Sequence, residues 1–129
     1  MSPGEISADV KRFVAEYIQA PEQLDILLLL HGQPNRQWTA AEISQAVFTV
    51  PTSATIRLEG MVASGLLVSS GGADPHYTFS PTSPGLRARV DELAAAYRAN
   101  RVAVIGLVFQ RPPDPLKSFS DAFRLRKEE

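Results

Sequence analysis

Two helix signals close together between residues 39 and 65 constrain the fold of this chain more than any other sequence feature. Thr39 is followed three residues later by Glu42, which is the spacing of a capping box, and this predicts a helix over 39–47. Pro51 predicts the start of a second helix over 52–64, because the missing N–H of proline has no partner to lose in a first helical turn. The few residues between these helices leave room only for a tight turn.

A β-hairpin is predicted directly after the second helix. Gly65 is placed to end that helix, since glycine accepts the left-handed backbone found at many helix C-termini. Residues 66–70 and 76–80 are short segments rich in strand-forming residues, and the glycine-rich segment 71–75 between them predicts a turn. The order is therefore helix, turn, helix, hairpin.

This order resembles a winged helix-turn-helix module. The resemblance rests on the two helices, on Met61-Val-Ala-Ser-Gly65-Leu-Leu-Val68 at the end of the second, and on the glycine-tipped hairpin. It is nearest to the MarR-like bacterial transcriptional regulators, in which the second helix enters the DNA major groove and the hairpin forms the wing. It implies a mainly α fold with a small β-hairpin (α+β), with flanking N- and C-terminal dimerisation helices. An apolar pattern of this kind specifies a fold better than a function.

Further helices are expected before the module. Apolar residues recur at three-and-four spacing over 7–20, with Ser7 as the cap, and this helix either joins a dimer interface or covers the core. A buried helix over 22–31 should follow and be closed by Gly32. We expect Trp38 to lie as a lid on the core rather than to bind a ligand. The winged-helix resemblance also implies that Gln37-Trp38 forms a small strand beside the hairpin.

One long helix is predicted after the hairpin, from 84 to about 110, because its apolar stripe stays in phase. Such a helix would be about 40 Å long and would project from the module. Residues 102–109 taken alone also suit a strand, but we favour a helix. A projecting apolar helix needs a partner, and a second copy of the chain would supply one through Leu86–Phe109 and a tail helix over Leu116–Phe123. The alternative is that the helix folds back onto its own core.

The length suits one winged-helix domain over 1–129, made of an N-terminal helix (7–20), a winged core (21–80) and C-terminal helices (84–126). The start of the sequence lacks the basic and apolar regions of a signal peptide. Its apolar runs are far shorter than the ~20 residues that cross a bilayer. A cytoplasmic protein with no membrane partner is the default expectation.

The sequence contains no recognised motif of catalysis or cofactor binding. The sequence has no cysteine, which excludes disulfides and thiolate metal sites, and its histidines, His31 and His76, are far apart. Nucleotide-binding glycine patterns, nucleophile elbows and zinc-protease motifs are also missing from the sequence. We therefore expect no enzyme, no catalytic residues, no cofactor and no metal.

The second helix of the module carries the candidate site. Its apolar face should pack inward, leaving Thr52, Ser53, Thr55 and Arg57 to contact DNA. Arg57 is the one side chain of this helix able to fork onto a guanine, and the alternative is a solvated surface arginine. Candidate phosphate contacts elsewhere in the chain are Lys11, Arg12, Arg36, Arg87 and Arg89.

Two functions remain open from the sequence. The resemblance implies a DNA-binding transcriptional regulator that acts as a homodimer on double-stranded DNA. Against it, the net charge is −1, whereas nucleic-acid binders usually show a basic excess, and the predicted wing tip contains Asp74 but no Lys or Arg. The alternative is a winged-helix protein–protein interaction module that does not bind DNA and docks a regulatory partner.

Overall fold

Six helices and a two-stranded hairpin make up residues 6–109, which are the residues that the computed structural model describes. The predicted tail helix over Leu116–Phe123 lies outside them. The fold is the α+β winged helix that the sequence predicts. In chain order the elements are α1 (Ala8–Tyr17), α2 (Pro21–Gly32), α3 (Ala40–Ala46), α4 (Pro51–Ala63), β1 (Leu67–Ser69), β2 (Tyr77–Phe79), α5 (Pro84–Ala99) and α6 (Arg101–Phe109).

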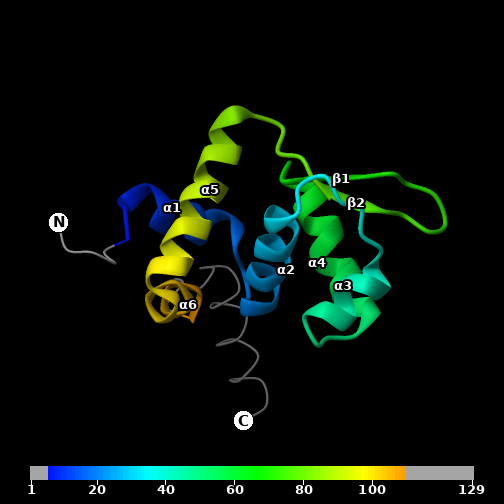
Figure 1. The fold of residues 1–129 in the computed structure, drawn as a ribbon, viewed down its shortest axis with the longest axis horizontal. Coiled ribbons are helices and arrows are strands. Elements are labelled where there is room, and N and C mark those ends of the chain that lie inside the picture. Colours follow the sequence, from blue (N-terminus) through cyan, green and yellow to red (C-terminus); the bar gives the residue numbers. More distant parts are fainter. Residues whose placement is uncertain (1–5, 110–129) are drawn as a thin grey trace, which may run out of the picture.

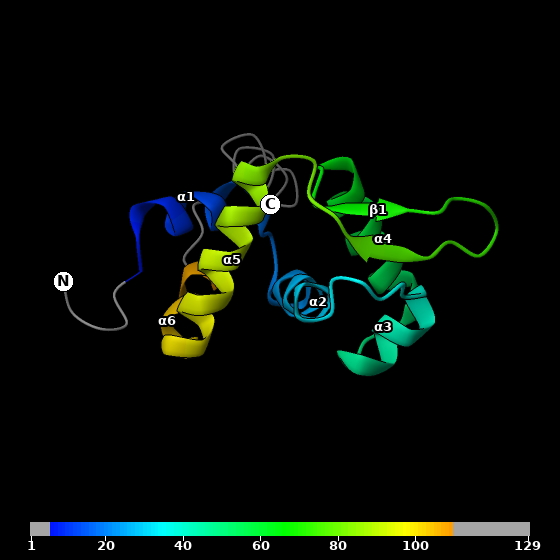
Figure 2. The same ribbon diagram turned by 45° about the horizontal axis from the view of Figure 1, so that its top comes forward.

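Helix α2 lies between two groups of elements. Figures 1 and 2 show α1, α5 and α6 on one side of it, and α3, α4 and the hairpin on the other. Because it has neighbours on both sides, α2 is apolar around most of its circumference, and Ile26, Leu27 and Leu30 are fully buried. No helix within residues 6–109 has both the length and the apolar character needed to cross a membrane.

The capping box of α3 is present as predicted. The Thr39 hydroxyl accepts a hydrogen bond from the Glu42 backbone N–H at 3.1 Å, and the Glu42 carboxylate accepts one from the Thr39 N–H at 2.9 Å. This second bond is the main reason that the pKa of Glu42 lies below its usual value, because it stabilises the charged carboxylate. The two residues therefore fix the start of the helix-turn-helix.

Gly65 ends α4, also as predicted. Its φ of +86° lies in the left-handed region. The Leu66 N–H bonds to the Met61 carbonyl at 2.9 Å and the Gly65 N–H bonds to the Val62 carbonyl at 3.1 Å, which is a Schellman motif. A Cβ at this position would lie 2.8 Å from the Thr82 hydroxyl oxygen. Both the backbone and the space around it therefore select glycine.

The wing pairs with a third short segment. Its strands are antiparallel, with Leu67 opposite Phe79 and Ser69 opposite Tyr77. Trp38 forms an isolated bridge to Tyr77 through two backbone hydrogen bonds of 2.9 and 2.7 Å, and its side chain is buried. The buried side chain agrees with the predicted lid on the core, while the predicted small strand is reduced to a single bridge at Trp38.

Helix α1 is shorter than predicted, and the connection from α1 to α2 is correspondingly longer. Ser7 caps α1, but the helix ends at Tyr17 rather than at residue 20. The buried side chain of Gln23 holds the linker, since its amide donates to the Tyr17 carbonyl at 2.5 Å and accepts from the Gln19 N–H at 2.9 Å. At the other end of α2, Gly32 lies within the helix and Gln33 is the C-cap, which corrects the predicted closing role of Gly32.

The prediction of a single long C-terminal helix is wrong, because the structure has two helices, α5 and α6. Asn100 leaves helical geometry (φ −154°, ψ 79°), and its side chain accepts a hydrogen bond from the Ala103 N–H at 3.2 Å, as an N-cap does. Residues 102–109 are helical as favoured, but α6 packs back against α1, α2 and α5 with Val104 and Val108 buried. The alternative of folding back onto the chain's own core is therefore the correct one.

Candidate nucleic-acid interface

Helix α4 buries one face and leaves the other open. Ala54, Leu58 and Met61 have no exposed surface and pack toward α2, as the apolar spacing predicts. The opposite side of the helix is a solvent-facing strip, which we call the open ridge. The open ridge consists of the exposed residues on the side of α4 opposite its buried face, which are Thr52, Ile56, Glu59, Gly60 and Ala63.

The predicted groove-contacting residues are spread over three directions. Thr52 lies on the open ridge, and Thr55 is half-buried on the flank opposite Ser53. Ser53 faces α2 instead, where its hydroxyl donates a hydrogen bond of 2.6 Å to the Glu22 carboxylate. The structure therefore leaves Thr52 as the predicted residue that is openly exposed.

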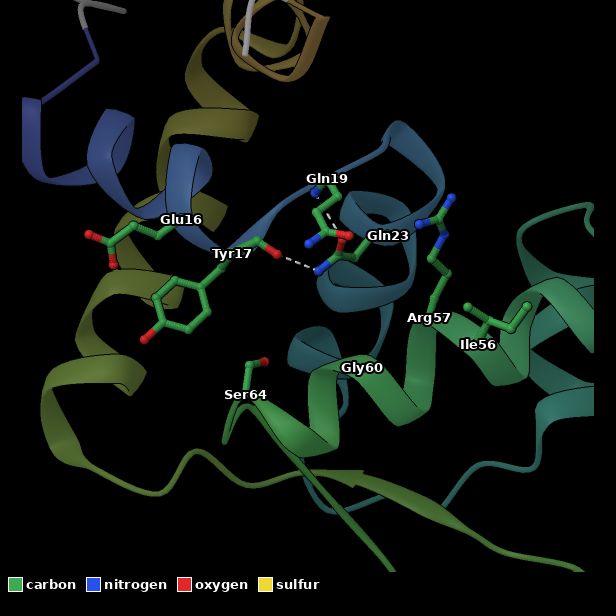
Figure 3. A pocket seen from close by; sticks show the side chains of 8 residues that line it. All are labelled: Glu16, Tyr17, Gln19, Gln23, Ile56, Arg57, Gly60 and Ser64. Atoms are coloured by element: carbon green, nitrogen blue, oxygen red, sulfur yellow. Dashed lines mark hydrogen bonds between the residues drawn. The ribbon is translucent and has the colours of Figure 1, made fainter. Parts of the chain in front are cut away.

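Arg57 is not on the open ridge either. We expected it to face outward, but it is half-buried on the flank of α4 that faces α2 and the end of α1. Figure 3 shows its side chain extending from α4 toward α2. Its Nε is shielded from solvent and has no hydrogen-bond partner among the described residues. The position of α2 sets this geometry, so helical periodicity alone could not reveal it.

Glu59 links the open ridge to the wing. Its carboxylate accepts a hydrogen bond from the Tyr77 hydroxyl. Burial, and then the bond to Glu59 and its negative charge, raise the pKa of Tyr77 to about 12. No sequence pattern indicates this pair, because the two residues are 18 positions apart and belong to different elements.

Arg36 is the other predicted cation in the winged half. Its guanidinium stacks over the Trp38 ring at 3.5 Å from the ring centre and lies 3.4 Å from the Glu42 carboxylate. The positive charge of Arg36 is therefore partly neutralised by Glu42, although the side chain remains exposed.

The remaining predicted phosphate contacts belong to α1 and α5, on the other side of α2 from α4 (Figures 1 and 2). Arg89 bonds the Glu92 carboxylate at 2.6 Å and lies 3.4 Å from Asp9. Asp9 is also 3.9 Å from Arg12. The residues on these two helices are Lys11, Arg12, Arg87 and Arg89. The fold does not gather the predicted cations around α4.

Large apolar side chains are exposed at the turn that leads into α4. Phe48 is 95% exposed, Ile56 is 65% exposed, and Val50 is also exposed. Phe48 has a φ of +59°, in the left-handed region that aromatic residues seldom adopt. The turn lies where the sequence predicts it, but the exposure of Phe48 and Val50 was not predicted.

The wing tip carries no basic residue. The loop between the strands extends away from α5 in both views (Figures 1 and 2). Gly71 and Gly72 both have positive φ, and Asp74 is exposed. The tip can offer backbone N–H groups to a partner, but no cationic side chain.

Solved structures share this fold. The multiple antibiotic-resistance repressor MarR from Listeria monocytogenes is 19% identical over 93% of this chain and 78% of its own, with a TM-score of 0.50. MepR, a transcription regulator of the Staphylococcus aureus multidrug efflux pump MepA, is 13% identical over 92% and 84%, with a TM-score of 0.51. The Mycobacterium tuberculosis transcriptional regulator MosR is 18% identical over 92% and 82%, with a TM-score of 0.52.

Sequence comparisons add nothing to this. No protein-family model matches the chain, and no curated protein matches it. At identities below one fifth, the likeness to the MarR-type regulators is one of fold. The winged helix-turn-helix resemblance read from residues 39–80 is confirmed at that level.

Proposed function

We propose that this protein is a DNA-binding transcriptional regulator that acts as a homodimer, with α4 in the DNA major groove. The observation that carries the proposal is the open ridge of α4, which is exposed along its length next to a projecting wing. A helix held by one buried face and open on the other has the shape that a major groove admits. MarR, a repressor, and the transcriptional regulators MepR and MosR share the fold.

The proposed groove contacts are Thr52, Ser53, Thr55 and Arg57. The three hydroxyl residues lie in the first turns of α4, where the helix N-terminus attracts phosphate. Arg57 would read a guanine after its side chain rotates out from the flank of α4. Lys11, Arg12 and Arg36 are proposed as phosphate contacts.

The proposed homodimer uses the C-terminal part of the chain, Leu86–Phe109 together with Leu116–Phe123. Val102 and Phe109 are exposed apolar residues on α6, and covering them with a second copy would remove this surface from water. Two-fold symmetry would then place the two α4 helices about one duplex turn, or ~34 Å, apart on a pseudo-palindromic site.

A second function is favoured by the chemistry of the same surface. None of the five residues of the open ridge is basic, and Glu59 among them is acidic. Ile56 on the ridge and Phe48 in the turn before α4 are exposed apolar groups. Interfaces between proteins favour such aromatic and aliphatic groups, whereas phosphate contacts need cations. The second candidate is therefore a winged-helix module that docks a regulatory protein and does not bind DNA.

A titration of DNA binding across salt concentrations separates the two functions. The full chain is titrated with duplexes enriched by selection from a random pool, and with a scrambled duplex as the control. A regulator that neutralises several phosphates gives a log–log slope of about −0.9 per contact and prefers the selected duplex. Weak binding with a flat salt response and no enriched sequence would contradict the DNA proposal and favour the docking module.

A further inference from the structure

Exposed apolar side chains gather at one end of α4. Of the six large apolar residues that are exposed among residues 6–109, three lie in the turn before α4 or in its first two turns, and they are Phe48, Val50 and Ile56. We call these three residues the apolar turn patch. A group of large apolar side chains on a protein surface marks a contact with a partner, whereas single ones need no explanation.

The backbone holds Phe48 outward at the end of α3. The Thr49 N–H bonds to the Ser44 carbonyl at 2.9 Å, so Phe48, with its φ of +59°, is the left-handed residue of this helix C-terminus. Glycine is the usual residue there, because a Cβ strains the left-handed backbone. The ring of Phe48 is 95% exposed, so no buried contact within the fold offsets the strain. Strain of this kind gathers at functional sites, which points to a contact between the ring and another molecule.

Two carboxylates flank Ile56 of the apolar turn patch. Glu59 lies three residues after Ile56 on the open ridge. Ser53, three residues before Ile56, holds the Glu22 carboxylate through a hydrogen bond of 2.6 Å. Residues three apart on a helix are neighbours, so both carboxylates lie about one helical turn from Ile56. A partner that covers the patch therefore needs cations beside its apolar side chains.

The charge of the whole winged core agrees with this requirement. Residues 21–80 contain five carboxylates and two arginines, which gives a formal charge of −3. Arg36 lies beside Glu42, and Arg57 extends toward α2, so neither arginine offsets the carboxylates at the patch. Residues 81–109 contain four arginines and two carboxylates, which gives +2. The acidic winged core attracts a cationic partner and repels phosphates.

We propose that the apolar turn patch and the open ridge dock an amphipathic helix of a partner protein, with apolar side chains on one face and Lys or Arg beside them. This rests on the second candidate function and names the chemistry of the regulatory partner. The open ridge suits a helix, because Thr52, Ile56 and Gly60 follow one another at four-residue spacing and Gly60 leaves a step beside Ile56. A Cβ added at Gly60 would meet no atom within 4 Å, so the step is open. Side chains of a second helix pack into such steps.

The test uses the full chain without DNA and two helical model peptides. Both peptides carry leucines on one face, with lysines beside them in one peptide and glutamates in the other. Fluorescence anisotropy of the labelled peptides measures affinity, and amide NMR shifts locate the contact. We expect saturable binding of the lysine peptide, with shifts centred on residues 48–60, and about tenfold weaker binding of the glutamate peptide. This comparison uses the unchanged chain, so it does not depend on whether a variant folds.

Three variants and a matched control locate the site. Phe48→Ala and Ile56→Ala truncate exposed side chains and should each weaken binding of the lysine peptide about tenfold. Glu59→Gln removes the charge but keeps an oxygen that can accept the bond from Tyr77, and should weaken binding about threefold. Val68→Ala truncates an exposed apolar residue on β1, which follows the other end of α4, and should leave the affinity unchanged.

The proposal is overturned if the lysine peptide does not bind saturably, if the glutamate peptide binds as tightly, or if Phe48→Ala or Ile56→Ala keeps full affinity. An equal loss in Val68→Ala would also overturn it. If the glutamate peptide binds at the same residues, docking at this surface stands and the charge assigned to the partner is wrong. If neither peptide binds, the salt titration of DNA binding decides the second candidate function separately.

Discussion

The Tyr77 hydroxyl on the wing donates a hydrogen bond to the Glu59 carboxylate on the open ridge of α4. The phenol ring is fully buried while Glu59 stays exposed, so the bond joins the core of the wing to the surface of the helix. It also uses one acceptor of Glu59 that a cytosine amino group would otherwise take. The wing and α4 are therefore coupled by a side-chain contact in addition to the chain that joins them.

This coupling predicts a late phase in the alkaline titration of tyrosine. The pKa of Tyr77 is about 12 in the folded chain, against about 10 for an exposed tyrosine. Between these values the unfolded chain loses the proton and the folded chain keeps it. The contribution of Tyr77 to stability is then complete below pH 10 and falls as the pH rises toward 12. Tyrosinate absorbance should show one late component that Tyr77→Phe lacks, and an unchanged titration curve in the variant would contradict this.

The glycines of α4 and its C-terminus should respond in opposite directions to alanine. Gly65→Ala should lower the free energy of unfolding by about 1–3 kcal/mol, because the left-handed backbone is strained for alanine and its Cβ would meet Thr82. Gly60→Ala is the matched control. It should raise the free energy of unfolding by about 0.5–1 kcal/mol, because the site is helical and has room for a methyl group. Denaturant unfolding of both variants measures this, and equal effects would refute it.

Phe48 is expected to lower the free energy of unfolding in its observed backbone conformation. Its backbone is left-handed and its side chain is almost fully exposed, so glycine would relieve the backbone and lose few contacts. We expect Phe48→Gly to raise the free energy of unfolding by about 1 kcal/mol. Phe48→Ala, which removes the ring but keeps the Cβ, should leave it nearly unchanged. A loss of stability in Phe48→Gly would show that the ring makes contacts that this conformation lacks.

Arg57→Ala should weaken binding to a selected DNA site by about 1–3 kcal/mol, because the proposed guanine contact would be lost. Arg98→Ala, which removes an exposed arginine from α5, should change that affinity little. Fluorescence anisotropy with the selected and scrambled duplexes measures both. Unchanged affinity of Arg57→Ala for the selected site would remove Arg57 from the proposed DNA contacts.

Locally encoded features were predictable from the sequence. The capping box of Thr39 and Glu42 and the glycine at residue 65 act through the backbone within a few residues, and the structure has both. The inward face of α4 was also predictable, because Ala54, Leu58 and Met61 follow the helical period.

Features that depend on a neighbouring element were not predictable in the same way. Asn100 breaks the C-terminal helix although the apolar stripe continues in phase through it, since periodicity carries no information about a capped kink. Arg57 occupies a flank because α2 and the linker before it pack there. A helical wheel gives the direction of a side chain, but not what lies on either side of it.

The hold of Gln23 on the linker between α1 and α2 has a consequence for assembly. The Gln23 carboxamide on α2 bonds the Tyr17 carbonyl at the end of α1 and the Gln19 N–H within the linker. It therefore helps set the angle between the half with α1, α5 and α6 and the half with α4. In the proposed homodimer, that angle determines the distance between the two α4 helices. The half-site spacing of an operator would thus depend partly on Gln23, a residue that is not among the proposed DNA contacts.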